Sequence, residues 1–296
     1  MRGALAAGLA AAVSLAPKGL AACACGLVVG PTAPLTGAAD RAALSAGLSV
    51  MQERYNFDEF GRLSRTPSDV RVHRGWLDLA AAWRPDDRWE LSASASYALS
   101  RVSLFGVEGN AHGVGDTVLR ARRVMVDAGA GWRPTVDLWA GLRLPTATHD
   151  DRALASVGGP GLGAFELSLG AELRWRVGVR WQLALSAELG ARSPSLEGAS
   201  MPGPRALVAG LGVWQPHPRV ALSVAPSVWV EAAPWQGGTA LANGALRRSS
   251  VAMGVTVQAD PWWRVGASAA GELPVEGFGQ NVAAYLRAGL NVTRVW

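Results

Sequence analysis

The chain has 296 residues, of which 49% are hydrophobic, 17% charged and 7% aromatic, and its formal net charge is +5. Average globular chains carry about 25% charged residues, so the composition argues against disorder and against nucleic-acid binding through charged clusters. Mean hydropathy is only +0.15, and no apolar stretch of about 20 residues follows position 24, which excludes a bundle of membrane-spanning helices. The 36 glycines exclude a coiled coil. These exclusions leave a β protein that is rich in glycine and tryptophan.

Residues 1–24 have the pattern of a secretory signal peptide. Arg2 supplies the positive charge, residues 4–15 form a short apolar segment, and Ala22-Cys23-Ala24 fits an A-x-A cleavage site. The string Leu20-Ala21-Ala22-Cys23 allows the alternative of a lipoprotein signal with Cys23 acylated. We predict cleavage after Ala24, with residues 25–40 as an N-terminal periplasmic segment; the alternative is that this stretch enters the lumen.

From about residue 41 onwards, apolar residues alternate with small or polar ones, which is the period of a β-strand. Leu91, Ala93 and Ala95, for example, alternate with serines. Twelve such segments follow one another: 41–55, 69–84, 88–103, 114–126, 131–146, 162–177, 180–193, 204–215, 218–231, 247–259, 262–275 and 281–296. Short connections alternate with longer ones, and the number of segments is even. This pattern predicts an all-β fold, a transmembrane antiparallel up-and-down barrel of about 12 strands over residues 41–296, with both termini periplasmic.

Nine of the 13 tryptophans lie within about five residues of a short turn or of the C-terminus. Indole settles at the boundary between hydrocarbon and headgroups, whereas tryptophans in the core of a soluble β protein would lie in mid-strand. We therefore predict that these nine form a membrane-interface belt: Trp83, Trp89, Trp132, Trp175, Trp181, Trp214, Trp262, Trp263 and Trp296. The other four, Trp76, Trp139, Trp229 and Trp235, are left unassigned.

The strand positions opposite the lipid-facing ones collect charged residues. Charges facing lipid at mid-depth cost several kcal/mol, so this segregation predicts a polar lumen in which both signs form ion pairs. The sequence does not decide between a narrow pore and a packed interior. The candidate lumen residues are Asp116, Arg120, Arg122, Arg143, Glu166, Glu172, Arg174, Arg180, Glu188, Arg192, Glu231, Glu272 and Arg287.

Two short stretches carry a family resemblance. Residues 113–122, with Gly115-Asp116 near their start, and the hexapeptide Gly141–Thr146 resemble the bacterial outer-membrane barrels labelled transporter or phenol-degradation (meta-pathway) barrels, which are loosely related to the long-chain fatty-acid porins. In that family Gly-Asp opens one strand and Gly-Leu-x-Leu-Pro-Thr-Gly closes the next; here Ala147 replaces the last glycine. The resemblance implies an outer-membrane barrel for uptake of small solutes, with hydrophobic molecules as one candidate class.

The same two stretches also suggest a contact at the outer rim. Folding residues 113–146 around a turn near Ala128 and Gly129 predicts that Asp116 lies opposite Gly141, with Arg143 next along and both charges on the lumen side. One interpretation is a structural pair that orders the rim, and the other is a gate or a ligand contact. We favour the structural pair.

The four histidines give little support for catalysis. We expect His112 and His149 in outer loops, His217 in a periplasmic turn, and His73 in a strand on the lipid-facing side. A hydrolytic site needs a nucleophile beside a histidine with an orienting partner, and no such spacing occurs. No two histidines are spaced as metal ligands. We therefore expect no enzymatic activity, no metal and no cofactor.

Two function hypotheses remain, a passive channel or uptake barrel for small solutes and a non-conducting structural or surface-interaction barrel with a packed polar lumen. The expected partners are the lipid bilayer of the outer membrane, the barrel-assembly machinery during insertion, and an unidentified small-molecule solute. The strand that ends at Trp296 suggests the assembly signal of such barrels. No nucleic acid is expected as a partner.

Overall fold

The computed structural model of the chain describes residues 40–57, 62–65, 70–104, 107–128, 131–147, 164–178, 180–194, 200–201, 203–236, 239–240, 245–273 and 283–296. The predicted signal peptide at 1–24 lies outside these ranges, as does all of the predicted N-terminal segment except residue 40. His149 also lies outside them.

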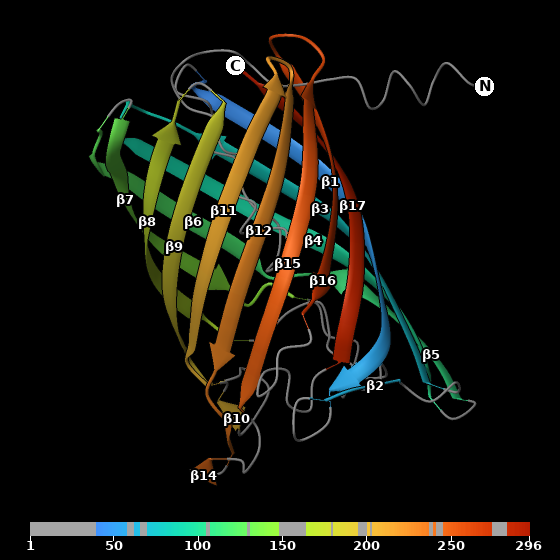
Figure 1. Cartoon of the computed structure of the whole chain (residues 1–296). Coiled ribbons are helices and arrows are strands. Elements are labelled where there is room, and N and C mark those ends of the chain that lie inside the picture. The colour runs from blue at the N-terminus through green and yellow to red at the C-terminus, as the bar shows by residue number, and fades with distance from the viewer. Residues whose placement is uncertain are drawn as a thin grey trace, which may run out of the picture.

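A closed antiparallel barrel of 12 strands forms the molecule, as predicted (Figure 1). Each strand pairs with its sequence neighbours, and the last strand pairs with the first from Ala43↔Val295 to Asn56↔Ala283, with one register shift near Glu53. The barrel strands are β1 (Ala42–Phe57), β3 (Val70–Trp83), β4 (Trp89–Leu104), β6 (Thr117–Val126), β7 (Gly131–Leu144), β8 (Glu166–Val177), β9 (Trp181–Arg192), β11 (Arg205–His217), β12 (Val220–Glu231), β15 (Leu246–Gln258), β16 (Trp263–Glu272) and β17 (Ala283–Val295).

The two ends of the barrel differ in their connections. At the end where β1 begins and β17 finishes, here called the terminus end, short turns join the strands, and the Arg41 backbone N–H donates to the Trp296 carbonyl over 2.6 Å. Asp86 and Asp260 order two of these turns, because each carboxylate accepts two backbone N–H groups at the start of the following strand. The longer connections lie at the opposite end, here called the loop end.

The predicted connection at 104–113 is wrong. Residues Val107–Val114 form β5, which pairs with the loop-end half of β4 and continues into β6 past Gly115 and Asp116. Strand β5 lacks apolar alternation because it extends beyond the barrel wall, where no membrane face has to be apolar (Figure 1). Four short strands were likewise not predicted, namely β2 (Leu63–Arg65), β10 (Ser200–Met201), β13 (Trp235–Gln236) and β14 (Thr239–Ala240).

Exposed and buried positions alternate along the strands, most regularly along β9. The outward positions present large apolar side chains to the surroundings, which suits hydrocarbon rather than water. They include Leu44, Leu48, Val50, Leu77, Leu79, Leu91, Leu99, Leu119, Leu138, Leu142, Leu167, Leu169, Leu183, Leu185, Leu189, Leu286 and Leu290. No helix in the described ranges is long and apolar enough to cross a membrane.

Candidate functional site: the charged wall of the lumen

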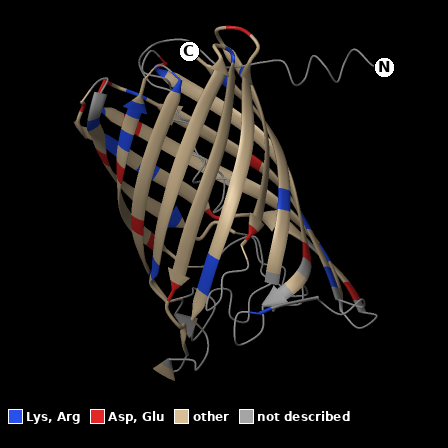
Figure 2. Cartoon of the chain, in the orientation of Figure 1, with Lys and Arg blue, Asp and Glu red and all other residues tan. Residues whose placement is uncertain are grey.

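Charged residues at inward positions are frequent on the consecutive strands β6 to β9 and at the loop ends of β11 and β12, while the rest of β11 and β12 is largely uncharged. Figure 2 marks the charged positions along the strands. One row of directly paired residues runs across this wall. The row begins with an arginine on β6, crosses three small residues and finishes with an arginine on β11: Arg120, Gly141, Ser168, Gly190 and Arg205. The small residues form a low floor over which the two arginines extend.

Arg205 lies flat over this floor. A Cβ atom at Gly190 would meet the Cγ and Nε atoms of Arg205 at 3.1 Å, so the arginine side chain would have to shift to accommodate any larger residue there. The Arg205 Nε and Nη2 groups donate to Glu166 over 3.0 and 2.6 Å, and Nη2 also donates to Glu188 over 2.5 Å. The guanidinium stacks 5.0 Å from the ring centre of Trp229. Arg205 therefore fastens β11 to β8 and β9.

Glu166 is the centre of this part of the wall, and only 2% of the residue is exposed. Besides Arg205 it accepts a hydrogen bond from the Arg192 Nε over 2.7 Å, and Arg143 approaches it to 3.9 Å. Arg192 also pairs with Glu231 on β12 over 2.7 Å. A carboxylate buried this deeply is stable only with such partners.

Arg120 crosses the wall from the other side. Its Nη2 donates to Glu188 over 3.1 Å, and its guanidinium lies 5.5 Å from the ring centre of Trp139. The Trp139 indole N–H donates to the same carboxylate over 3.3 Å. The indole lies against Gly170, where an added Cβ would come within 2.3 Å of the ring. Two glycines of the wall thus make room for two long side chains.

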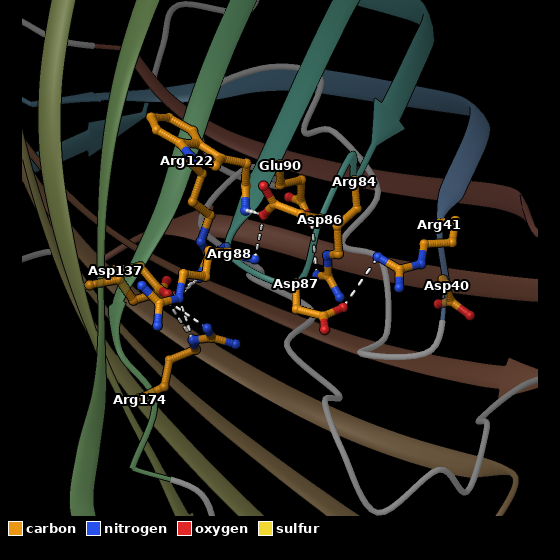
Figure 3. A network of polar contacts seen from close by, with 12 residues as sticks. Asp40, Arg41, Arg84, Asp86, Asp87, Arg88, Glu90, Arg122, Asp137 and Arg174 are labelled. Carbon is orange, nitrogen blue, oxygen red and sulfur yellow. Dashed lines mark hydrogen bonds and ion pairs between the residues drawn. The ribbon is translucent and has the colours of Figure 1, made fainter.

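A second cluster lies nearer the terminus end (Figure 3). Asp137 is fully buried and pairs with Arg122 and Arg174, over 2.5 and 2.6 Å. Arg122 also pairs with Glu172 over 2.6 Å. Arg84 and Glu90 form a neighbouring pair over 3.1 Å.

Small residues line the opposite wall, from β15 through β17 and β1 to β4. The inward positions there include Gly47, Ser49, Ala80, Ser94, Ala98, Ala252, Gly266, Ala270 and Gly289. Larger groups interrupt this wall. Trp76 and Arg287 lie 4.9 Å apart, with Arg287 also bonded to Ser49 and Asp78. Arg74 pairs with Glu53, and Arg248 pairs with Glu272. Between the two walls, the inward positions of β11 from Leu207 to Val213 are apolar, and those of β12 from Ala221 to Ser227 alternate alanine with serine.

Most of the predicted lumen residues do face the lumen. Twelve of the 13 lie on the inner side of the wall, and ten of these belong to the clusters above or to the Asp78–Arg287 pair. Glu272 forms a separate ion pair with Arg248 over 3.5 Å, and Asp116 lies at the rim. Arg180 is a correction, because it lies exposed in the turn before β9 rather than on the wall.

Two central residues, Asp137 and Arg205, were missed. Asp137 lies an even number of residues from Arg143 on β7, so the alternation that assigned Arg143 to the lumen also predicts that Asp137 faces the lumen. Arg205 is harder to recognise, because both faces of β11 are largely apolar and the pattern does not distinguish lumen from lipid. Three of the four unassigned tryptophans, Trp76, Trp139 and Trp229, lie on the lumen side with an arginine over each ring.

The predicted register at the rim is wrong. Gly141 pairs with Arg120, while Asp116 lies beyond the Thr117↔Leu144 pair at the loop end. There the Asp116 carboxylate accepts the Ala147 N–H over 3.3 Å, and the Thr146 hydroxyl accepts the Thr117 N–H over 2.8 Å and contacts the Gly115 carbonyl. We call residues 115–117 with 146–147 the rim clasp. The two stretches that carry the family resemblance therefore meet and close the β6–β7 edge.

Seven of the nine belt tryptophans are exposed on the outside at the terminus end: Trp83, Trp89, Trp181, Trp214, Trp262, Trp263 and Trp296. Trp175 faces outward but is only partly exposed, and the side chain of Trp132 lies outside the described part. Trp181 stacks on Trp214, and Arg294 lies over both Trp263 and Trp296. A cation beside an indole suits the boundary between hydrocarbon and phosphate groups.

The histidines lie apart from the charged wall. His73 faces outward on β3, as expected, and His217 ends β11. His112 lies in β5 rather than in a loop, with its Nδ1 atom 2.9 Å from the Tyr97 hydroxyl. Within the described ranges no group of three or more His, Cys, Asp or Glu side chains is arranged to hold a metal ion.

Comparison with known proteins gives the fold a context. No family model matches the chain, and no curated protein sequence matches it significantly. Among solved structures, an outer membrane channel from Pseudomonas putida F1 superposes with a TM-score of 0.69 at 17% identity, covering 87% of this chain and 96% of that one. The β domain of the Bordetella autotransporter BrkA gives 0.52 at 13% identity, covering 86% and 100% of the two chains.

A third neighbour is a deletion mutant of the monoaromatic hydrocarbon channel TodX, which gives a TM-score of 0.50 at 11% identity and covers 97% and 98% of the two chains. All three neighbours share the architecture of an outer-membrane barrel. The likeness shows a shared barrel fold, and the apolar outer surface of this chain suits the hydrocarbon layer of a membrane.

Proposed function

We propose that the chain is a passive outer-membrane channel for the uptake of small solutes, with hydrophobic molecules as one candidate class. The proposal draws on the channel neighbours, one of which is described as a monoaromatic hydrocarbon channel, and above all on the way the lumen charges are paired. We propose transport in place of catalysis.

The observation that carries the proposal is the direction of the ion pairs. Within the described ranges, the lumen pairs join strands that neighbour one another or lie close around the wall. The widest, Arg120–Glu188, runs from β6 past β7 and β8 to β9. The pairs between described residues therefore neutralise charge along the wall, and none of them ties opposite walls together. A lumen plugged by its own charges would need pairs that cross it.

The second support is the asymmetry of the lumen. The charged wall faces strands on which many inward positions are glycine, alanine or serine, and small side chains leave the lumen wider at those positions. The apolar inward positions of β11 add a surface on which a solute with hydrocarbon groups can rest. Such a lumen suits solutes with both polar and apolar parts.

We further propose that the terminus end is periplasmic and that the β17 strand is recognised by the barrel-assembly machinery. Short turns and an interfacial tryptophan belt at this end support the orientation, because outer-membrane barrels have short periplasmic turns and longer outer loops. Labelling of single cysteines in intact cells tests it. A membrane-impermeant reagent should reach Gly109→Cys in β5 but not Asp87→Cys in the β3–β4 turn, and the reverse pattern would invert the assignment.

Conductance of the purified protein in a planar bilayer tests the channel. Discrete openings are expected for the native chain. The second candidate, a non-conducting surface barrel with a packed lumen, predicts silence. Liposome swelling with uncharged sugars is the matching solute assay, and the absence of both conductance and swelling in correctly folded protein would refute the proposal.

A further inference from the structure

Three arginines of the charged wall hold N–H groups with no acceptor among the described residues. The Nε groups of Arg120 and Arg143 and the Nη1 group of Arg205 are buried and make no hydrogen bond with any described residue. Buried donors are nearly always paired in native proteins, and an unpaired one costs about 1–3 kcal/mol. Three such donors in one cluster indicate spare capacity for an acceptor from outside the chain.

The three arginines lie close together in the wall, because they share the carboxylates of Glu166 and Glu188. Arg205 and Arg143 both approach Glu166, and Arg205 and Arg120 share Glu188. On the sheet, Arg120 lies opposite Gly141, and Arg143 follows two residues later on the same face of β7. The donors therefore surround the floor formed by Gly141, Ser168 and Gly190.

The carboxylates of the cluster have no matching spare capacity. Each oxygen of Glu166 already accepts from an arginine, Oε1 from Arg205 and Oε2 from Arg192. Glu188 accepts from Arg205 on one oxygen and from Arg120 on the other. The unmet requirement is thus for an acceptor, which excludes a cation as the ligand and favours an anion. A planar carboxylate matches the fork of arginine N–H groups.

The residues around these donors favour an anion that carries an aromatic ring. The Arg120 guanidinium stacks on Trp139 with one face, and 38% of its side chain is exposed, so its other face is open to the lumen. Guanidinium planes stack readily on aromatic rings. Leu207, paired with Glu188 on the neighbouring strand, supplies an apolar edge beside the same place.

We propose that this cluster is a binding site for aromatic carboxylates, with the carboxylate accepting from Arg143 and Arg205 and the ring stacked on Arg120. The site selects this class among the solutes of the channel, and its role in uptake rests on the proposed function. The binding itself does not depend on conduction.

Isothermal titration of benzoate into the detergent-solubilised full-length barrel tests the site. Arg143→Gln removes one donor whose contact with Glu166 is long, at 3.9 Å, and the affinity for benzoate should fall about tenfold or more. Arg101→Gln is the matched control, because Arg101 is an exposed arginine that pairs with Glu108 on the outer hairpin, and it should leave the affinity unchanged. Heat-modifiability on gels and circular dichroism show whether each variant is folded.

Three further probes separate the parts of the proposal. Benzyl alcohol should bind far more weakly than benzoate, because it cannot accept as an anion. Cyclohexanecarboxylate and inorganic phosphate should also bind more weakly, because neither presents a planar ring. Equal affinity for benzoate in native and Arg143→Gln protein, or equal affinity for any of these probes and benzoate, overturns the assignment. A barrel that conducts but does not bind benzoate refutes the site alone, whereas one that binds but does not conduct refutes the channel alone.

Discussion

Gly190 on β9 and Arg205 on β11 are directly paired, and the arginine side chain extends across the glycine to reach Glu166 two strands away. The bare backbone gives the arginine room, since a Cβ at position 190 would crowd the Arg205 Cγ and Nε atoms at 3.1 Å. The charged wall depends on residues without side chains as much as on charged ones.

Gly190→Val should displace Arg205 and lower the free energy of unfolding by about 1–3 kcal/mol, the usual cost of overpacking. Urea unfolding in detergent micelles, followed by tryptophan fluorescence, measures this loss. Gly212→Val is the control, because Gly212 lies on the outward face and an added Cβ would meet its neighbours at ordinary distances of 3.5 and 3.9 Å. Equal losses in both variants would contradict the role given to Gly190.

Glu166→Ala should destabilise the barrel strongly. Removing one member of a buried ion-pair cluster leaves unpaired arginines, which costs about 3–5 kcal/mol. Glu108→Ala breaks an exposed pair with Arg101 and should cost at most about 1 kcal/mol. Urea unfolding compares the two. A Glu166 variant as stable as the Glu108 variant would mean that the wall cluster contributes little.

The rim clasp has a structural role, so Thr146→Val should lower stability without changing single-channel conductance. The hydroxyl makes hydrogen bonds to Thr117 and Gly115, and its loss should cost about 1–2 kcal/mol. Asp116→Asn should behave in the same way, with a lower temperature of heat-modifiability on gels. Altered conductance at unchanged stability would instead favour a gate at this rim.

The turn at Asp86 should be sensitive to acid. Two backbone N–H groups, those of Arg88 and Trp89, hold the pKa of the Asp86 carboxyl below its ordinary value, with Arg41 and Arg88 adding to the effect. A depressed pKa means that the turn is stabilised above the ordinary aspartate pKa and loses this as the pH falls through the lowered value. An NMR titration should give a midpoint below that of Asp86 in an unfolded peptide, and the Trp89 amide should exchange faster in Asp86→Ala at neutral pH.

A strand of this fold can be predicted from the sequence where it crosses the hydrocarbon layer of the membrane. Inside the hydrocarbon layer every outward position must be apolar, so the strands containing Leu91 or Leu183 are evident from alternation alone. Strand β5, with Glu108, Asn110 and His112, lies beyond the barrel wall, where outward positions need not be apolar, and it shows no such alternation. The bounds of the other strands differ from the prediction by a few residues.

The site is less predictable because it depends on register. Which strand faces Gly141 is set by hydrogen bonds along β6 and β7, and the estimate from a turn near Ala128 displaced Asp116 by several residues. Alternation does indicate that Arg120 and Glu188 face the lumen. Their contact spans three strand intervals, and the Trp139 indole that joins it fits over the bare backbone of Gly170, which only the folded wall reveals.

The seam between β17 and β1 has a consequence for the integrity of the wall. It is paired along most of both strands, and Asp40, just before β1, is tied to Arg264 on β16 over 2.8 Å. Without β17, both β1 and β16 would present a row of unpaired N–H and C=O groups to hydrocarbon, and each such group costs several kcal/mol there. Removing the last strand would therefore cost far more than its own contacts, because it would turn a closed cylinder into an open sheet with two bare edges.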